Sequence, residues 1–427
     1  MTEAISEAPR PTAAADESPA ADVTVLIVGG GPAGMMAGLL FARAGVKTLV
    51  LEKHGDFFRD FRGDTVHPST LDLFAKLGLL EGLLQRPHDE ARKLTVLIGG
   101  RHYAVADFSH LPAACGFVAL MPQWEFLDFI AKAASAYPTF SLRMNCEAVG
   151  LTMTNGRTTG VKTAYGEQLS AQLVIAADGR HSAMRDAAGL KPKDLGAPMD
   201  VFWFRVPKKN DGSNQTTGVF GAGRIMVLID RGDYWQCAFV FAKGSADAIR
   251  SRGIDAFRDD VASAVPLLSP AIAAVKSWDD VKLLSVALNR LTNWSRPGFL
   301  AIGDAAHAMS PIGGIGINLA VQDALATATI LASKLGRGGE VDNLLPRVQR
   351  RRMFATRAVQ AAQRVIQNRI IGRVLAQSAQ SVITEAPSIV RLLDRFPILQ
   401  RIPARLVGLG VRREHIRSPD AFSRTDR

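Results

Sequence analysis

The sequence has few of the residues that build disulfide frameworks and metal sites. Among 427 residues there are three cysteines, Cys115, Cys146 and Cys237, widely separated and without a C-x-x-C pair. An odd number of distant cysteines argues against a disulfide scaffold or a zinc site, and it favours a reducing compartment. The eight histidines also show no metal-ligand spacing. We therefore expect a cytoplasmic protein with no metal.

The N-terminus lacks the apolar stretch of a signal peptide. Residues 1–21 are mainly Ala, Pro, Glu and Ser with a single arginine, which predicts a disordered tail. The remaining chain is long enough for two or more structural units with sizeable cores. Its 47% hydrophobic and 21% charged residues are typical of a soluble globular protein.

Lysine is absent from residues 341–427, whereas this segment contains 17 arginines and six acidic residues. It therefore carries the whole formal net charge of +11. A basic arm that contacts anionic lipid or nucleic acid is one interpretation, and terminal helices with a solvated basic face are the other. We favour the second, because acids interrupt the basic run and no nucleic-acid-binding motif is present. Peripheral membrane contact through this segment stays open.

Charge is also absent from Val23 to Ala42, a 20-residue run long enough to span a membrane. Gly34 and Gly38 even have the G-x-x-x-G spacing of transmembrane dimers. However, three consecutive glycines followed by Pro32 disfavour a continuous helix. The β-branched run VTVLIV, the turn, a helix to about Arg43 and the run VKTLVLEK instead predict a βαβ unit.

Gly29, Gly31 and Gly34 fit G-x-G-x-x-G, the fingerprint of dinucleotide binding. Its glycines allow a tight turn, a bare backbone beneath a pyrophosphate and close packing of helix on strand. A helix beginning near Ala33 offers unpaired N–H groups and a partial positive charge to phosphates. Glu52 follows the second strand, where a carboxylate can accept hydrogen bonds from ribose hydroxyls.

Two later segments have the same strand–turn–helix pattern. QLVIAADGRHSAMRDAAG predicts a strand, a turn at Asp178-Gly179 and a helix capped by Ser182. RPGFLAIGDAAHAMSPIGGIGINLAVQDALATATILASKLG predicts a strand that ends at Gly303-Asp304, a glycine-rich loop and a helix from about Ile317 to Leu335. An acid beside a glycine-rich helix start suits a polyol chain and an anionic ring system.

The three motifs in this order resemble the FAD-dependent monooxygenases of the para-hydroxybenzoate hydroxylase-like superfamily, the single-component aromatic hydroxylases. The resemblance covers roughly residues 22–418. It implies an α/β protein with α+β elements. A Rossmann-like FAD domain of glutathione-reductase type would be interleaved with a mostly antiparallel substrate domain and followed by a helical C-terminal part.

The domain boundaries follow from this pattern and the β-meander signature near residues 199–242. We expect the FAD domain in residues 22–90, 116–195 and 296–345, the substrate domain in 91–115 and 196–295, and Arg-rich helices in 346–427. Within the last part, an apolar face is expected from Met353 to Leu375, formed by Val359, Ala362, Ile366 and Ile370, with arginines opposite.

By position, the resemblance assigns residues of every motif to the cofactor. They are Gly29, Gly31, Pro32, Ala33, Gly34, Glu52, Lys53, Arg62, Gln123, Asp178, Gly179, Arg185, Gly303, Asp304, Pro311, Gly314, Gly316 and Asn318. The early glycines would hold the pyrophosphate, Glu52 the adenosine ribose and Asp304 the ribityl chain. Backbone amides of residues 314–318 would face the flavin pyrimidine edge, with Pro311 against the ring system. Solvated positions are the alternative for Arg62 and Gln123.

The implied activity is hydroxylation of an aromatic or quinone-like small molecule with NAD(P)H and O2, through a flavin C4a-hydroperoxide. Such chemistry belongs to the cofactor, which explains why no catalytic triad or carboxylate pair is present. The sequence identifies no catalytic base, and Arg62, His102, Tyr103 and Tyr234 are candidates only. A reductase or halogenase of the same fold is the alternative, although the W-x-W-x-I-P segment of flavin halogenases is absent. A non-catalytic FAD-binding module at a membrane surface is the third.

Overall fold

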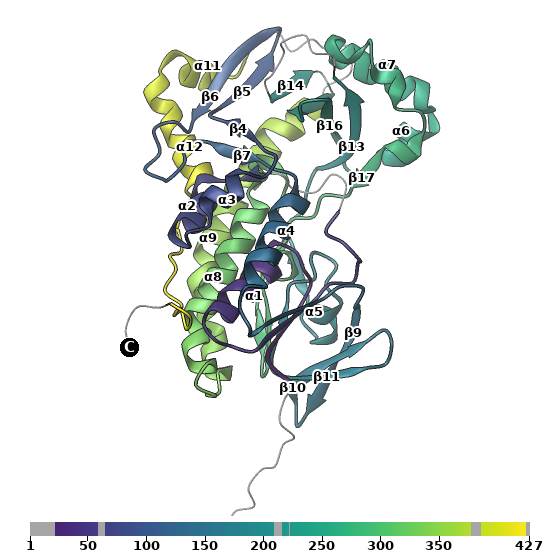
Figure 1. Ribbon diagram of the computed structural model, residues 1–427. Helices are drawn as coiled ribbons and strands as arrows, with labels where there is room; N and C mark the ends of the chain where they lie inside the picture. The colour runs from purple at the N-terminus through teal and green to yellow at the C-terminus, as the bar shows by residue number, and fades with distance from the viewer. Residues whose placement is uncertain (1–21, 59–64, 209–215, 222, 377–385, 424–427) are drawn as a thin grey trace, which may run out of the picture.

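A computed structural model describes residues 22–58, 65–208, 216–221, 223–376 and 386–423. The molecule is elongated, with one large sheet in the lower half and a second in the upper half of Figure 1. Two long helices, α8 (Gly316–Leu335) and α9 (Leu345–Ile366), pack against each other beside the lower sheet, and α9 continues toward the upper one. The predicted mixed α/β fold is confirmed.

The lower sheet has eight strands, six of them in the order β19-β20-β11-β1-β2-β8. Five of these six run parallel, and β19 is antiparallel to β20. Strands β10 and β9 extend from β11 as an antiparallel ribbon. The bounds are β1 (Val23–Val28), β2 (Thr48–Leu51), β8 (Phe140–Arg143), β9 (Ala148–Thr154), β10 (Arg157–Thr163), β11 (Gln168–Ala176), β19 (Ser295–Arg296) and β20 (Phe299–Ala301).

The apolar opening segment forms two elements of this sheet layer rather than one membrane-spanning helix. Strand β1 ends before the glycines, and α1 (Pro32–Arg43) begins at Pro32, which has no backbone N–H to lose at a helix start. Helix α1 packs against α8 and α4 (Gln123–Ala134). Its lack of charge is therefore explained by burial between the sheet and neighbouring helices.

One helical segment in the described residues, Ile312–Leu335, is long and apolar enough to cross a membrane. However, 78% of its apolar window is buried inside the protein, as expected for a core helix. It corresponds to α8 with the preceding turn η5 (Ile312–Gly314).

The upper sheet has seven strands in the order β17-β13-β16-β15-β14-β5-β6. It is antiparallel except where β14 and β5 pair in parallel. The bounds are β5 (Lys93–Ile98), β6 (Arg101–Asp107), β13 (Met199–Pro207), β14 (Thr217–Gly221), β15 (Arg224–Asp230), β16 (Tyr234–Ala242) and β17 (Lys282–Leu284). All seven strands lie within residues 91–115 and 196–295, which we propose as the substrate domain.

Shorter elements connect the two layers. Two small sheets consist of β3 (Thr65–Val66), β7 (Val118–Leu120) and β4 (Asp89–Ala91), and of β12 (Pro192–Asp194) with β18 (Asn289–Leu291). The remaining α-helices are α2 (Pro68–Lys76), α3 (Leu80–Leu84), α5 (Ala183–Ala187), α6 (Ala246–Ser251), α7 (Ile254–Ala264), α10 (Gly372–Leu375), α11 (Ser388–Arg395) and α12 (Arg401–Gly408). Short turns of helix are η1 (Pro266–Leu268), η2 (Ile272–Ala274), η3 (Trp278–Asp280), η4 (Gly303–Ala305), η6 (Asp342–Leu344), η8 (Pro397–Gln400) and the π-helical η7 (Gln367–Ile371).

The upper sheet has two different faces. Alternate residues of β13 and β16 pack under α6 and α7, and together with α7 they form an aromatic core of Phe202, Phe204, Phe239, Phe241 and Phe257. The opposite face carries Val201, Trp203, Ala238 and Val240, which share a hydrophobic cluster with Ile312 and Ile371. The aromatic core therefore packs the sheet onto its helices, whereas the opposite face meets η5 and η7.

The expected face of the helix from Met353 to Leu375 is wrong in part. Val359 is buried, but Ala362, Ile366 and Ile370 are only half-buried. The fully buried positions of the stretch include four polar residues: Thr356, Gln360, Gln363 and Gln367. Its arginines, Arg357, Arg364, Arg369 and Arg373, are exposed, as expected. Arg352, just before the stretch, lies in the interior because it binds the buried carboxylate of Asp323.

Candidate functional site

The predicted motifs meet at one edge of the lower sheet. Strands β20, β11, β1 and β2 are parallel neighbours, and their last residues are in register: Val28 pairs with Ala176 and Leu51, and Ala176 pairs with Ala301. Each motif begins within two residues of one of these ends. The carboxyl ends of parallel strands are where ligands bind in open α/β sheets.

The glycine turn after β1 is fixed by close backbone packing. Gly29 has φ +104°, and a Cβ there would lie 2.5 Å from the carbonyl oxygen of Ala177. A Cβ at Gly34 would lie 1.9 Å from the carbonyl oxygen of Gly29. A Cβ at Gly31 would meet nothing within 4 Å, so the backbone is open there. Gly29 and Gly34 thus allow the turn, and Gly31, ahead of Pro32 and Ala33, leaves room for a ligand at the start of α1.

Glu52 lies at the edge of this turn. Its Oε2 accepts a hydrogen bond from the Gly30 amide (2.9 Å) and its Oε1 one from the His54 amide (3.1 Å). The side chain is 9% exposed, whereas the neighbouring Lys53 is exposed. The carboxylate is therefore held rigidly beside the glycine turn, in a position that suits a ribose.

The turn after β11 supports its own helix. Ser182 caps α5 as predicted, since its hydroxyl accepts a hydrogen bond from the Arg185 amide (2.9 Å). Asp178 supports this cap by accepting hydrogen bonds from the Ser182 hydroxyl and the Met184 amide (3.1 Å). Burial raises the pKa of Asp178, although these hydrogen bonds oppose the change. Gly179 has φ +88°, which favours glycine. Arg185 is buried and donates to the Arg180 carbonyl (3.0 Å), so it supports the turn from within.

The turn after β20 packs on the first motif. A Cβ at Gly303 would lie 2.9 Å from the Ala33 Cβ, so this glycine allows η4 to contact the start of α1. The side chain of Asp304 remains 33% exposed, with an Oδ2 oxygen 3.7 Å from Nη2 of Arg180. This carboxylate therefore keeps hydrogen-bonding capacity toward a polar ligand next to the glycine turn.

The loop that leads into α8 presents its backbone. Gly314 has φ +61°, and its carbonyl accepts a hydrogen bond from the Thr65 hydroxyl (2.7 Å). The side-chain oxygen of Asn318 accepts from the His67 amide (2.9 Å) and the Thr70 hydroxyl (2.7 Å). That side chain is therefore used to join α8 to α2. A Cβ at Gly316 would meet nothing within 4 Å, so the backbone at the helix start, near Pro311, is open.

A group of buried polar residues lies behind these loops, and we call it the polar seam. Its members are His307, Asp323, Arg352, Gln360, Gln363, Gln367 and Glu414. Asp323 accepts hydrogen bonds from Arg352 (2.8 Å) and the Gly303 amide (3.1 Å), and Nε2 of His307 lies 2.6 Å from its Oδ2. Burial raises the pKa of Asp323, but His307 and Arg352 lower it further, so the group is ionised. The seam therefore anchors the Gly303 turn.

The glutamines of the seam reach the next loop. Gln360 donates to the Asn289 carbonyl (2.8 Å), and Gln363 donates to the carbonyls of Ser310 (2.9 Å) and Ile312 (3.1 Å). Gln367, one turn later in the π-helical η7, is fully buried, and neither of its amide atoms has a hydrogen-bond partner among the described residues. Buried polar atoms are nearly always paired, so this amide differs from those of Gln360 and Gln363.

The sequence did not identify the polar seam as part of the site. Asp323 was visible as a single acid within an otherwise apolar helix, which implies a buried partner. Its partner Arg352 belongs to an Arg-rich run whose members look alike in sequence. Spacing alone could not tell which arginine faces inward.

The other predicted residues are not joined to the motifs in the same way. Gln123 is the first residue of α4 and is half-buried. Arg62 lies outside the described residues. His102 is exposed on the edge strand β6, and Tyr234 stacks beneath the Arg205 guanidinium at the start of β16. Tyr103 is buried near Ile98 and Ala386. Within the described part of the chain, no side chain among these is placed as a catalytic base.

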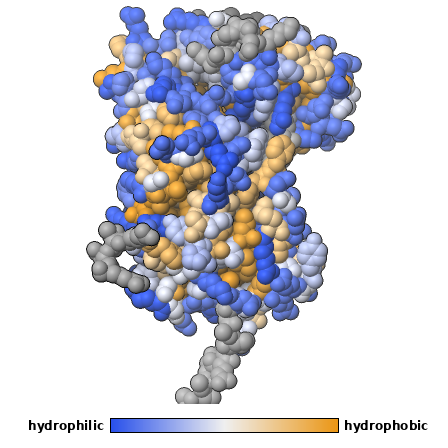
Figure 2. All heavy atoms as spheres, in the orientation of Figure 1, coloured by the Kyte–Doolittle hydropathy of each residue, from blue (hydrophilic) through white to orange (hydrophobic). Residues whose placement is uncertain are grey.

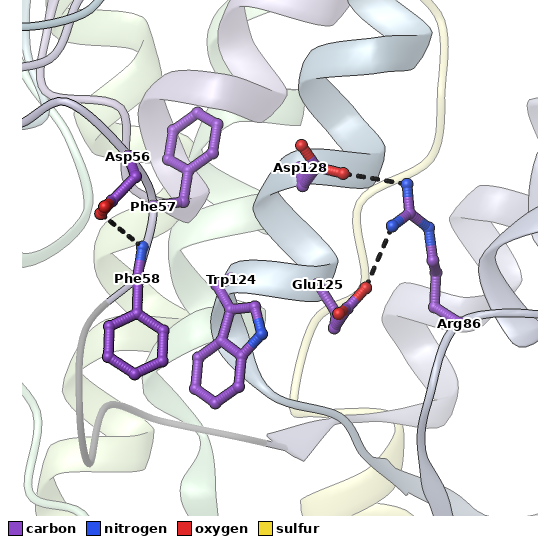
Figure 3. Close-up of a pocket in the computed structure, with 7 residues that line it drawn as sticks. All are labelled: Asp56, Phe57, Phe58, Arg86, Trp124, Glu125 and Asp128. Atoms are coloured by element: carbon purple, nitrogen blue, oxygen red, sulfur yellow. Dashed lines mark hydrogen bonds and ion pairs between the residues drawn. The ribbon is translucent and has the colours of Figure 1, made fainter.

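An open pocket of about 210 Å³ adjoins the glycine turn on the Glu52 side. A Cβ at Gly30 would lie 3.1 Å from both Glu52 and the Phe57 ring, and Phe57 lines the pocket. In Figure 3 the rings of Phe58 and Trp124 lie side by side, while Arg86 binds Glu125 and Asp128. Aromatic rings among carboxylates suit a nucleoside base better than a phosphate.

The residues present fit FAD. The backbone opening at Gly31 lies at a helix start, a carboxylate stands on each side of it at Glu52 and Asp304, and a second open helix start follows at Gly316. These features define an FAD-binding flavoprotein with one largely parallel and one largely antiparallel sheet. The FAD binding domain family matches residues 22–362, and the chain belongs to this family. It is an enzyme of the FAD-dependent monooxygenase class.

Three known proteins illustrate the similarity. The 6-methylpretetramide 4-monooxygenase of Streptomyces rimosus is 30% identical over 388 residues, covering 88% of this chain and 92% of that protein. The structure of PqsL from Pseudomonas aeruginosa with 2-aminobenzoylacetate is 20% identical with a TM-score of 0.70, covering 83% and 97%. The Diels-Alderase PyrE3 is 21% identical with a TM-score of 0.72, covering 92% and 81%. The two structures support the fold.

Proposed function

We propose that this protein hydroxylates an aromatic or quinone-like small molecule of polyketide type, with NAD(P)H and O2 as co-substrates. The observation that carries the proposal is the meeting of four motif ends at the in-register edge of β20, β11, β1 and β2. The similarity to a 6-methylpretetramide monooxygenase over 88% of this chain supports the substrate class. Bound FAD would supply the redox chemistry, and the protein would supply binding, orientation and exclusion of water.

The residues that would hold the cofactor divide by position. Gly31 and the start of α1 would face the pyrophosphate, and Glu52 would accept hydrogen bonds from the adenosine ribose. Asp304 would bind the ribityl chain, and the backbone at Gly316 would face the flavin ring. The polar seam holds the turn at Asp304 and the loop before Gly316, because Asp323 binds the Gly303 amide and Gln363 binds the loop at Ser310 and Ile312.

The substrate would lie between the 311–316 loop and the opposite face of the upper sheet. Ile312 shares a hydrophobic cluster with Trp203, Phe220 and Val227, so apolar walls adjoin the loop. A flat aromatic molecule is bound well by such walls. Gln367 has a buried amide with no partner among the described residues, and it offers one acceptor and two donor hydrogens to a phenol or quinone oxygen.

Substrate-stimulated oxidation of NAD(P)H by the FAD-loaded enzyme tests this function. We expect oxidation to accelerate with a phenolic polyketide, and hydroxylated product to form with little hydrogen peroxide. Asp304→Asn should lower FAD affinity by about 10-fold, because a charge-assisted hydrogen bond is lost. Asp247→Asn, at a side chain 99% exposed on α6, is the matched control and should leave FAD affinity unchanged.

The same assay separates the other activities of this fold. A reductase would convert its substrate under anaerobic conditions, whereas hydroxylation would stop. A non-catalytic module would bind FAD without oxidising NAD(P)H. The fold likeness to the Diels-Alderase PyrE3 favours a ring-forming activity as a second candidate. Such an activity would proceed without NAD(P)H and O2.

A further inference from the structure

The helices at the upper left of Figure 1 expose an unusual set of apolar side chains. They lie on α11, η8, α12 and the residue that joins α11 to η8, and they are between 43% and 68% exposed. We call them the α11–α12 face: Ile389, Leu392, Phe396, Ile398, Ile402 and Leu406. Hydrophobic colour is visible in Figure 2 on the left side of the molecule, at the level of α12. Single exposed apolar residues are normal, but six on consecutive helices of one segment mark an interaction surface.

These apolar residues are not required by the packing of the helices. The inner side of α12 is already buried through Ala404, which joins the cluster of Ala106 and Phe108. Val390 packs near Tyr103 on the inner side of α11. On the outer side, Ile398, Ile402 and Leu406 repeat every four residues and therefore form one exposed stripe. The helices are thus apolar on two sides, and the described residues cover the inner side only.

The charge around the stripe has one sign. Arg391, Arg395, Arg401 and Arg405 are exposed at i, i+4 spacing on the same two helices. Among residues 386–413, Asp394 is the only acid. Its carboxylate binds inward, to the Ala104 amide (3.0 Å) and to Arg101 (3.3 Å). The outer surface therefore combines exposed apolar side chains with the exposed guanidinium groups of Arg395, Arg401 and Arg405.

We propose that the α11–α12 face docks on an anionic lipid surface. Apolar side chains beside arginines are the pattern of helices that lie in the plane of a bilayer interface, with the arginines at the headgroups. A second copy of the chain fits less well, because a two-fold interface would bring Arg395, Arg401 and Arg405 of both copies together, and their like charges repel. Docking would place β6 and the upper sheet beside the lipid phase, into which apolar aromatic compounds partition.

Co-sedimentation of the full FAD-loaded chain with vesicles tests the proposal. We expect binding to phosphatidylglycerol vesicles at low salt, weaker binding at high salt, and little binding to phosphatidylcholine vesicles. Arg401→Gln with Arg405→Gln should weaken binding by about 30-fold, from about 1 kcal/mol for each arginine. Ile398→Ser with Ile402→Ser should weaken it by about 10-fold or more, because exposed apolar area is lost.

Two matched double variants serve as controls. Arg347→Gln with Arg350→Gln removes the same charge from exposed positions of the first turns of α9. Val149→Ser with Met153→Ser removes apolar side chains that are 50% and 55% exposed on β9. Both controls should bind vesicles like the wild type. Flavin absorbance and thermal unfolding of every variant establish that the protein is folded.

Three results would overturn the proposal. The first is no binding to phosphatidylglycerol vesicles at low salt. The second is an equal loss of binding in the control variants, which would indicate that overall charge or exposed apolar area, rather than this face, is responsible. The third is a wild-type dimer that the isoleucine variant converts to a monomer with unchanged vesicle binding, which would assign the face to a second copy.

Discussion

Two interiors of this molecule are equally closed to solvent but are built from opposite residue types. The aromatic core under α6 and α7 contains five phenylalanines with ring contacts such as Phe204–Phe257 at 5.3 Å. The polar seam between α8 and α9 contains an arginine and an aspartate that are both 0% exposed. Apolar contacts are non-directional and hold a sheet on its helices. Directional hydrogen bonds hold single loops, and the seam binds the loops at Gly303, Ser310 and Ile312.

The difference indicates that the two interiors have separate roles, one in fold stability and the other in both stability and FAD binding. A change in the aromatic core should alter the stability of the fold and leave FAD binding unchanged. A change in the polar seam should alter both, because the loops it holds are those assigned to the cofactor. The following predictions test that division, beginning with the largest expected effect.

Arg352→Met should lower the free energy of unfolding by about 3–5 kcal/mol, since it leaves the buried Asp323 carboxylate without its arginine partner. It should also lower the FAD content after gel filtration, because Asp323 holds the Gly303 amide. Denaturant unfolding and flavin absorbance measure the two effects. Arg350→Met, at an exposed position on the same helix, is the control. If Arg352→Met were destabilised but retained FAD normally, the polar seam would have no role in FAD binding.

His67 should make stability depend on pH. It is buried beside the start of α8, with Nδ1 2.8 Å from the Val407 carbonyl, and burial lowers its pKa to about 4. Between pH 6.5 and 4 the unfolded chain takes up a proton that the folded chain refuses, so stability falls as the pH falls. Wild type should lose about 1.6 kcal/mol more of its free energy of unfolding than His67→Gln between pH 6.5 and 5. The free energy of unfolding of both proteins is measured by urea titration at each pH. An equal loss in wild type and His67→Gln as the pH falls would contradict the prediction.

Phe257→Leu should lower the free energy of unfolding by about 2 kcal/mol, because it opens space within the aromatic core. FAD affinity of the folded protein should equal that of the wild type. Phe354→Leu, at a side chain 60% exposed on α9, should change stability by less than about 0.5 kcal/mol. A loss of FAD affinity in Phe257→Leu, measured by flavin fluorescence, would mean that the two interiors are coupled.

Substitution of two glutamines one turn apart should change the free energy of unfolding in opposite directions. Gln363→Leu leaves the Ser310 and Ile312 backbone groups unpaired and should destabilise by about 1–3 kcal/mol. Gln367→Leu removes an amide that has no partner among the described residues and should stabilise by about 1 kcal/mol. Under the proposed function it should also raise the share of hydrogen peroxide in turnover. A destabilised Gln367→Leu with normal coupling would exclude a role at the substrate.

Some of this architecture could be predicted from sequence because local chemistry determines it. The glycines before Pro32 exclude a continuous helix, and Gly316 and Leu335 bound α8 close to the expected Ile317–Leu335. The inward face of α9 could not be predicted, because Arg352, Gln360 and Gln363 are buried by partners from distant segments. The exposed stripe from Ile398 to Leu406 was missed for a related reason. Helical periodicity shows that two faces are apolar but not which one the rest of the chain covers.

Turnover under labelled oxygen tests the central claim most directly. The FAD-loaded enzyme, NAD(P)H and an aromatic polyketide are incubated under ¹⁸O₂, and the product is analysed by mass spectrometry. We predict one ¹⁸O atom per product molecule and one NAD(P)H consumed for each hydroxylation. Product that forms without O2 or NAD(P)H, or that contains oxygen from water, would contradict the assignment as a monooxygenase.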